Sequence, residues 1–133
     1  MMLKHLALVC SSESGSDRFY GELLGLKKLN TKMLSAALSK QIFNLESEYQ
    51  IINYAGDGLH FEIFIGPLPH AGRNKIDHVC LEIDDFESFL QKCRLMGIKI
   101  SQIPRGDSTV TFISDDDGNL FEIKGQQKPA VVG

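Results

Sequence analysis

The sequence predicts an α+β fold made of two similar halves, and two observations support this prediction. The stretch DGLHFEI at Asp57–Ile63 returns as DGNLFEI at Asp117–Ile123. Each half also contains a short apolar run that begins at a histidine, His5 in the first half and His78 in the second, followed by a helical pattern. Matching strands and helices in the same order indicate a duplicated supersecondary unit.

In the first half, the run Lys4–Val9 has the length of a strand. Ser16 or Asp17 is expected to cap a helix that ends at Gly25, because apolar residues share one face of the segment between them. The remaining elements are expected to be a strand, a short extra helix and two strands: Leu26–Leu34, Ser35–Leu45, Tyr49–Tyr54 and Leu59–Ile65.

In the second half, Asp77–Glu82 is the strand that corresponds to the run at His5. Asp84 or Asp85 is expected to cap a helix that ends at Gly97. Its apolar face would hold Phe86, Phe89, Leu90 and Cys93. Three strands are expected to follow, with a turn before the last: Ile98–Ile103, Thr109–Ile113 and Asn119–Lys124.

At 133 residues the chain is expected to be a single domain. Its first module would span about residues 3–66 and its second about residues 76–125. A linker rich in glycine and proline at about 66–75 would join them, and residues 126–133 would form a tail.

The composition is that of an ordinary globular protein, with 43% apolar and 23% charged residues. A net charge of −3 with scattered cations argues against nucleic acid as a partner. Neither a signal peptide nor a membrane span is expected, which makes the cytoplasm the expected location. Cys10, Cys80 and Cys93 lack metal-site spacing and are expected to be buried thiols.

Alternation along the strands assigns the polar residues to faces. If the large aliphatic side chains pack under the helices, both histidines and both glutamates of the repeats fall on the opposite face: His5, Glu62, His78 and Glu122. Two imidazoles and two carboxylates suit a borderline divalent cation. The alternative is that each is a solvated residue on a strand, which is the usual fate of a lone histidine or glutamate.

Taken in order, these motifs resemble the vicinal oxygen chelate superfamily, which includes glyoxalase I. The resemblance runs from about Leu3 to Gly125 and rests on HLALVC, FYGELLGLKKL, FEIFIG, DHVCLEIDD and DDDGNLFEIKG. It implies a glyoxalase-like fold, in which two βαβββ modules form a half-open, eight-stranded mixed cup resembling a β-barrel. It also implies one divalent metal ion per site, held by His5, Glu62, His78 and Glu122, with Zn, Ni, Co, Mn and Fe equally compatible.

The four-ligand set resembles that of the lyases and isomerases of this superfamily. The implied activity is that of a lactoylglutathione lyase-like enzyme acting on a small α-oxo substrate such as a thiol adduct, by proton abstraction next to a carbonyl through a metal-stabilised enediolate. Glu122 is the first choice for the base and Glu62 the second. A methylmalonyl-CoA epimerase-like isomerase is one alternative, and a non-enzymatic protein that sequesters a ligand, as bleomycin-resistance proteins do, is another.

The resemblance departs from small bacterial glyoxalase I proteins at two positions that would bind glutathione. Val9 stands in place of an arginine, and Gly66 stands near an expected asparagine. Contacts to the substrate are assigned instead to His60, Arg105 and Lys124, although each is also compatible with an ordinary surface role. Relatives commonly complete the site by pairing, so a homodimer is expected, with the ligands drawn from one chain or from two.

Overall fold

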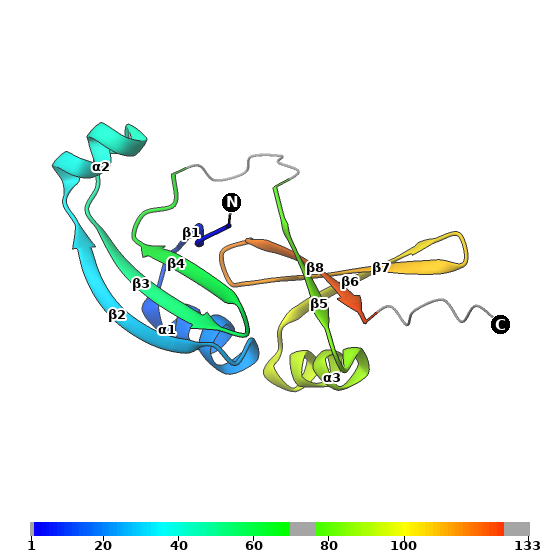
Figure 1. The fold of residues 1–133 in the computed structure, drawn as a ribbon. Coiled ribbons are helices and arrows are strands. Elements are labelled where there is room, and N and C mark those ends of the chain that lie inside the picture. The colour runs from blue at the N-terminus through cyan, green and yellow to red at the C-terminus, as the bar shows by residue number, and fades with distance from the viewer. Residues whose placement is uncertain (1, 70–76, 127–133) are drawn as a thin grey trace. The chain divides into compact units, whose positions relative to one another are not determined.

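The structure is a computed structural model of the chain that describes residues 2–69 and 77–126. These residues form two compact units, residues 2–69 and residues 77–126, and each unit is described by itself (Figure 1). Most of the expected linker and of the expected tail lies outside the described residues. Among the helices of the described part, none combines the length and the apolar character that crossing a membrane requires.

The first unit is a four-stranded sheet with helical segments. Its strands lie in the order β1-β4-β3-β2, with β1 parallel to β4 and the other neighbours antiparallel. The elements are β1 (Leu6–Cys10), α1 (Glu13–Ser16), the π-helix η1 (Asp17–Leu23), β2 (Lys27–Leu34), α2 (Ala36–Phe43), β3 (Tyr49–Gly56) and β4 (Leu59–Ile65). All four strands and the extra helix α2 lie where they were expected.

The first helical segment begins earlier than predicted. Ser12, rather than Ser16 or Asp17, is the N-cap, and its side chain accepts a hydrogen bond from the backbone N–H of Gly15 at 3.1 Å. The chain then continues as a π-helix and leaves it through Gly25, whose φ of 72° suits glycine. The predicted N-cap was wrong because the prediction used the apolar residues of η1 to locate the start of the helix, whereas the observed first turn is polar.

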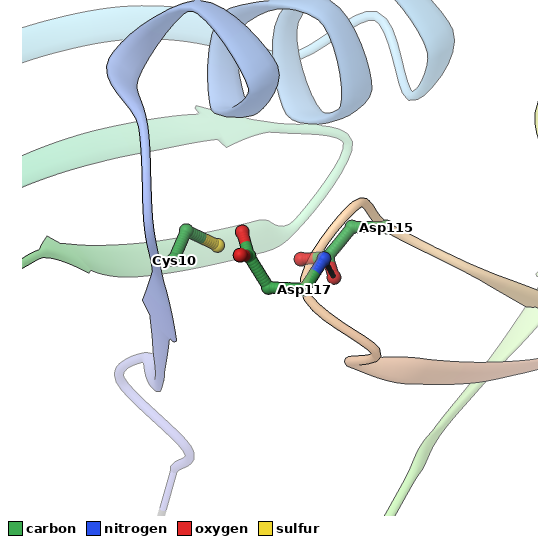
Figure 2. Close-up of side chains that lie close together, drawn as sticks. All are labelled: Cys10, Asp115 and Asp117. Atoms are coloured by element: carbon green, nitrogen blue, oxygen red, sulfur yellow. Dashed lines mark hydrogen bonds between the residues drawn. The ribbon is translucent and has the colours of Figure 1, made fainter. Parts of the chain in front are cut away.

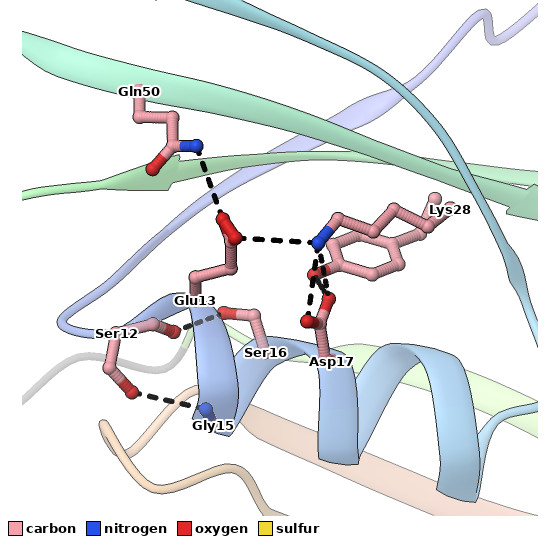
Figure 3. A network of polar contacts seen from close by, with 8 residues as sticks. Ser12, Glu13, Gly15, Ser16, Asp17, Lys28 and Gln50 are labelled. Carbon is pink, nitrogen blue, oxygen red and sulfur yellow. Dashed lines mark hydrogen bonds and ion pairs between the residues drawn. The ribbon is translucent and has the colours of Figure 1, made fainter.

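That polar turn is tied to the sheet by side chains from distant strands (Figure 3). Glu13 accepts a hydrogen bond from Gln50 at 3.2 Å, and Lys28 contacts both Glu13 and Asp17 at 3.4 and 3.1 Å. Tyr54 donates its hydroxyl to Asp17 at 2.7 Å. The hydrogen bond to Asp17 raises the pKa of Lys28, and burial followed by the same carboxylate raises the pKa of Tyr54.

The helical face of the first sheet is an aromatic core. Tyr20 of η1 packs on Tyr54 and Phe61, with ring centroids 5.7 and 5.4 Å apart, and all three are fully buried. Ile52 and Ile63 are also inaccessible to solvent. Residues that alternate with Phe61 and Ile63 along β4 must therefore point to the other side of the sheet.

The other side of the first sheet carries a second apolar cluster at one end. Leu34, Tyr49, Ile51 and Phe64 are buried together, and Phe43 of α2 packs edge-on against Phe64 with centroids 5.7 Å apart. Ser35 caps α2 by accepting from the N–H of Leu38 at 3.2 Å. The extra helix thus covers the part of this face that lies beyond Glu62 along β4.

Within residues 77–126, the second unit repeats the pattern without an extra helix. It contains β5 (Val79–Ile83), α3 (Phe86–Met96), β6 (Lys99–Arg105), β7 (Ser108–Ser114) and β8 (Leu120–Gly125), with strand order β5-β8-β7-β6. Strand β5 is parallel to β8, and the other pairs are antiparallel. The prediction of an α+β fold with two βαβββ modules is confirmed.

Local chemistry fixes both ends of α3 as predicted. Asp85 caps the helix by accepting from the N–H of Ser88 at 3.1 Å, and Gly97 ends it in the left-handed region at φ 69°. Leu90 and Cys93 of α3 are buried, as are Ile113 and Phe121 of the sheet, and α3 packs against β6 and β8. Phe86 and Phe89 are only partly buried, so the apolar face of α3 is narrower than its sequence pattern indicates.

The turn between β7 and β8 is held by one buried aspartate. Asp115 accepts backbone N–H groups of Asp117 and Asn119 at 3.0 and 2.9 Å, and the Asn119 side chain at 2.7 Å. Figure 2 shows Asp115 and Asp117 within this turn. Because aspartate readily bonds to the backbone two residues ahead, this SDDDGN segment is explained as a turn.

The cysteines divide into two buried thiols and one exposed thiol. Cys10 and Cys93 are buried, as predicted, but Cys80 is exposed, so that part of the prediction was wrong. Cys80 is on the β5 face that points away from α3, because its neighbour Leu81 occupies the buried face. An apolar run does not bury both faces of a strand when only one face is covered by a helix.

Candidate metal centre

The first half of the candidate site is a histidine–glutamate pair on β1 and β4. Ala7 lies opposite Glu62 in the parallel register, and His5 precedes Ala7 by two residues, so the strand places both polar residues on one face. Nε2 of His5 lies 3.5 Å from Oε2 of Glu62. The side chains are 44% and 15% exposed, which leaves them open to a ligand while Glu62 is partly enclosed.

The second half repeats this arrangement on β5 and β8. Cys80 lies opposite Glu122, and His78 precedes Cys80 by two residues. Nε2 of His78 lies 3.6 Å from Oε1 of Glu122, with side chains 33% and 19% exposed. Since Phe121 and Ile123 are buried toward α3, the pair lies on the sheet face opposite the helix.

The separations within the two pairs fit a shared cation better than a direct hydrogen bond. A strong hydrogen bond between nitrogen and oxygen spans about 2.7–3.2 Å, and both pairs are longer. Two ligand atoms about 2.0–2.2 Å from one ion lie roughly 2.8–3.1 Å apart at octahedral angles and roughly 3.3–3.6 Å apart at tetrahedral angles. A shift of a few tenths of an ångström would therefore let each pair bind an ion, and imidazole with carboxylate is a donor set that divalent transition metals accept.

His60 is the polar neighbour of the first pair. It shares a face of β4 with Glu62, its ring centroid lies 5.8 Å from that of His5, and its Nε2 lies 2.7 Å from Oδ1 of Asn53. Asn53, which is buried, lies opposite Glu62 in the antiparallel register. His60 is thus held beside the pair rather than left to move freely in solvent.

The two cations expected to contact a substrate are placed differently. Lys124 lies next to Glu122, with Nζ 3.7 Å from Oε2, and its side chain is 58% exposed. Arg105 ends β6, where its carbonyl oxygen accepts the Ser108 hydroxyl at 2.9 Å. It lies four residues beyond Ser101, which is in register with Phe112 opposite Glu122, or roughly 13 Å along the strand. The structure thus brings Lys124 to the second pair but does not bring Arg105 there.

The sequence did not single out three residues that border the pairs. Asn53 and Phe112 lie directly opposite Glu62 and Glu122, and the Phe112 ring is 5.8 Å from that of His78 in an edge-on contact. Cys80 lies on the other side of Glu122. Cys80 could have been identified from the sequence, because alternation along β5 places it on the same face as His78. Asn53 on β3 and Phe112 on β7 could not, because their positions opposite the glutamates depend on the register between neighbouring strands.

The two positions that depart from bacterial glyoxalase I lie in apolar surroundings. Val9 packs against the cluster of Tyr49, Ile51 and Phe64. A Cβ atom at Gly66 would lie 2.6 Å from the Tyr49 ring. Tyr49 therefore fills the space that a side chain at position 66 would need, and neither position offers a polar group to a glutathione carboxylate.

Comparisons with known proteins bear on the family and the fold of the chain. The chain matches the family model of the Glyoxalase/Bleomycin resistance protein/Dioxygenase superfamily over residues 2–123. A comparison with curated protein sequences finds no significant match.

Solved structures share the fold at low sequence identity. The genomically encoded fosfomycin resistance protein FosX from Listeria monocytogenes has a TM-score of 0.70 at 14% identity, covering 96% of this chain and 94% of its own. A structure of the same protein complexed with Mn(II) and sulfate has a TM-score of 0.70 at 15% identity, covering 95% and 90%. A glyoxalase family protein from Enterococcus faecalis has a TM-score of 0.69 at 18% identity, covering 92% and 95%. The chain belongs to the Glyoxalase/Bleomycin resistance protein/Dioxygenase superfamily.

Proposed function

We propose that the chain is a metal-dependent lyase or isomerase of the glyoxalase I type. The observation that carries this proposal is the duplicated pair: His5 with Glu62 on the face of the first sheet opposite η1, and His78 with Glu122 on the face of the second sheet opposite α3, with nitrogen and oxygen 3.5–3.6 Å apart in each. Each pair supplies half of a four-ligand set for one divalent cation. The second pair can come from the same chain or from a partner chain in a homodimer.

A cation held by these residues would polarise a substrate carbonyl as a Lewis acid, contributing several kcal/mol to the stabilisation of negative charge. Glu122 is our first choice for the group that removes the proton beside that carbonyl. It is 19% exposed, so it can reach a ligand, and Lys124 balances its charge. Glu62 is our second choice, and the histidines act as fixed ligands.

Two further points support a metal-dependent enzyme over a protein that only sequesters a ligand. All four candidate ligands are present, so the proposed donor set is complete. In addition, the Mn(II) complex of the Listeria FosX shows that a protein of this fold holds a divalent cation. The substrate is proposed to be a small α-oxo compound, and Arg105 is proposed to act only on a substrate that extends along β6.

The proposal is tested by measuring bound metal and turnover together. Purified chain, loaded in turn with Zn, Ni, Co, Mn and Fe, is expected to hold about one ion per chain. Glu122→Gln is expected to keep its fold, to bind the ion at least about tenfold more weakly and to lose turnover. Glu87→Gln is the matched control, since Glu87 is exposed on α3, away from the sheet face that bears the pair.

The substrates separate the candidate activities. The hemithioacetal of methylglyoxal with glutathione, and with other thiols, tests the lyase reaction. Deuterium uptake from solvent at the α-carbon of methylmalonyl-CoA tests the epimerase alternative. Tight binding of bleomycin without turnover would indicate sequestration. Metal content and turnover that are unchanged in Glu122→Gln would remove Glu122 from both proposed roles.

A further inference from the structure

His60 is held by contacts that fix which of its ring nitrogens carries the proton. Asn53 donates its Nδ2 to the backbone carbonyl of Asn30 at 3.4 Å, so its Oδ1 is the atom that faces Nε2 of His60 at 2.7 Å. The reversed amide would set two acceptors, Asn53 Oδ1 and the Asn30 carbonyl, against each other. An amide oxygen can only accept, and Nε2 of His60 must therefore donate.

A neutral imidazole whose Nε2 carries the proton has a bare Nδ1, and this atom can only accept a hydrogen bond. His60 is partly exposed, shares the face of Glu62 and lies beside the His5 ring. The hydrogen bond to Asn53 uses Nε2, which leaves Nδ1 for a ligand on that face. Asn53 itself is 6% exposed and has both ends of its amide engaged, so the arrangement is built in before any ligand arrives.

We propose that His60 is a specificity-determining residue that selects substrates with a hydroxyl group next to the metal-bound oxygen. Its Nδ1 accepts the hydrogen bond of that hydroxyl, and Asn53 is the positioning residue that accepts from Nε2 and so orients the ring and its tautomer. The acceptor therefore favours an α-hydroxy carbonyl compound over an analogue that lacks the hydroxyl. This inference rests on the proposed binding of a cation by the His5–Glu62 pair.

The first test is the tautomer itself, which does not depend on turnover. Nitrogen-15 NMR of the metal-free chain at about pH 8.5, where an ordinary imidazole is neutral, is expected to show His60 with its proton on Nε2. Asn53→Leu, which is similar in size and lacks the acceptor, is expected to give a mixture of the two tautomers. A wild-type His60 with its proton on Nδ1 would overturn the inference.

The second test uses two variants that each keep one of the nitrogen positions of His60. In His60→Asn, the amide oxygen can take the place of Nδ1, and the contact with Asn53 is lost. In His60→Gln, the amide can take the place of Nε2 and hold Asn53, and the acceptor at Nδ1 is lost. A merely structural His60 would therefore be replaced better by glutamine, and a ligand-binding His60 by asparagine.

The readout is the binding of hydroxyacetone and methoxyacetone to the zinc-loaded chain, followed by NMR titration. Both probes offer the metal a carbonyl and a second oxygen, and only hydroxyacetone can donate a hydrogen bond. The ratio of their affinities in wild type is expected to exceed that in His60→Gln by roughly fivefold, which corresponds to one hydrogen bond of about 1 kcal/mol. His60→Asn is expected to retain most of the wild-type ratio.

The outcomes separate this inference from the proposed function. Equal ratios in wild type and His60→Gln, with zinc bound in both, would overturn the role of His60 and leave the metal site standing. If His60→Gln kept the wild-type ratio of affinities and His60→Asn lost it, His60 would have a structural role. This result would also overturn the inference. A wild-type chain that takes up no divalent cation would overturn the proposed function, and the role of His60 toward a ligand with it.

Discussion

Gly66 lies directly against an aromatic ring, and replacing it with alanine is expected to destabilise the first unit. A Cβ atom at this position would lie 2.6 and 2.7 Å from Cδ1 and Cε1 of Tyr49, and 3.3 Å from the carbonyl oxygen of Glu48. Non-bonded carbon atoms are best separated by about 3.5–4.0 Å. The Tyr49 ring or the end of β4 would therefore have to move by about 1 Å.

Moving either the Tyr49 ring or the end of β4 would weaken hydrogen bonds and packing. The Tyr49 hydroxyl donates to the carbonyl of Pro67 at 2.7 Å, and its ring lies edge-on to Phe64 with centroids 6.2 Å apart. The backbone N–H of Gly66 extends the pairing of β4 with β1 by donating to the Cys10 carbonyl at 3.1 Å. Overpacking of this kind costs about 1–3 kcal/mol. The smaller entropy of alanine in the unfolded chain offsets about 0.4–1 kcal/mol of this cost.

The prediction is therefore that Gly66→Ala lowers the free energy of unfolding by about 1–2 kcal/mol. Gly125→Ala is the matched control, because Gly125 ends β8 as Gly66 follows β4, and a Cβ atom there meets Phe86 only at 3.4 Å. The control is expected to be neutral or slightly stabilising. Urea denaturation followed by far-UV circular dichroism measures both variants, and the chain has no tryptophan for a fluorescence assay.

A double-mutant cycle tests whether the loss of stability in Gly66→Ala comes from contact with the Tyr49 ring. In a Tyr49→Ala background the space beside Gly66 is open, so Gly66→Ala is expected to lose most of its destabilising effect. If Gly66→Ala proves as stable as Gly125→Ala, or equally destabilising with and without the Tyr49 ring, the reasoning is refuted. If it holds, an asparagine at this position cannot be restored to bind glutathione without displacing Tyr49.

Two further predictions concern buried groups. Tyr54→Phe removes the hydroxyl that Asp17 accepts at 2.7 Å and is expected to cost about 1–2 kcal/mol. Because the pKa of Tyr54 is raised in the folded chain, wild type should lose stability as the pH rises above about 10, and the variant should lose less of it in urea titrations at pH 9 and 11. Among the thiols, Cys80 is expected to react first with a chromogenic disulfide reagent, while Cys10 and Cys93 react only on unfolding; burial raises the pKa of Cys93, which slows it further. Fast reaction of two thiols in the folded chain, or of none, would contradict the burial of these side chains.

Most of the fold could be predicted because the strands and helix ends carry local signals. The strand Leu59–Ile65 was predicted with its observed bounds, and Gly97 ends α3 as expected. The start of the first helix could not be predicted in the same way. Its first turn is stabilised by Lys28 and Gln50, which are far away in the sequence, and only the folded sheet brings them to Glu13.

The candidate site was predictable to the extent that it depends on alternation along single strands. The face shared by His5 and Ala7, and that shared by His60 and Glu62, follows from a period of two. What lies opposite each glutamate depends on the register between antiparallel strands, which one sequence does not encode locally. For this reason Asn53 and Phe112 were missed, although both border the histidine–glutamate pairs.

The duplication kept the candidate metal-binding residues and changed what surrounds them. The residue opposite the glutamate is Asn53 in the first module and Phe112 in the second, and the residue on its other side is Ala7 in the first and Cys80 in the second. Under the proposed function, one cation is bound by similar ligands from the two modules, whereas a substrate that lacks two-fold symmetry needs different groups on its two sides. The first module offers a hydrogen-bonded amide and imidazole, and the second an aromatic ring, a thiol and a lysine. The candidate ligands are thus the same in both modules while their neighbours differ, as we expect of a site that binds one ion and one unsymmetrical small molecule.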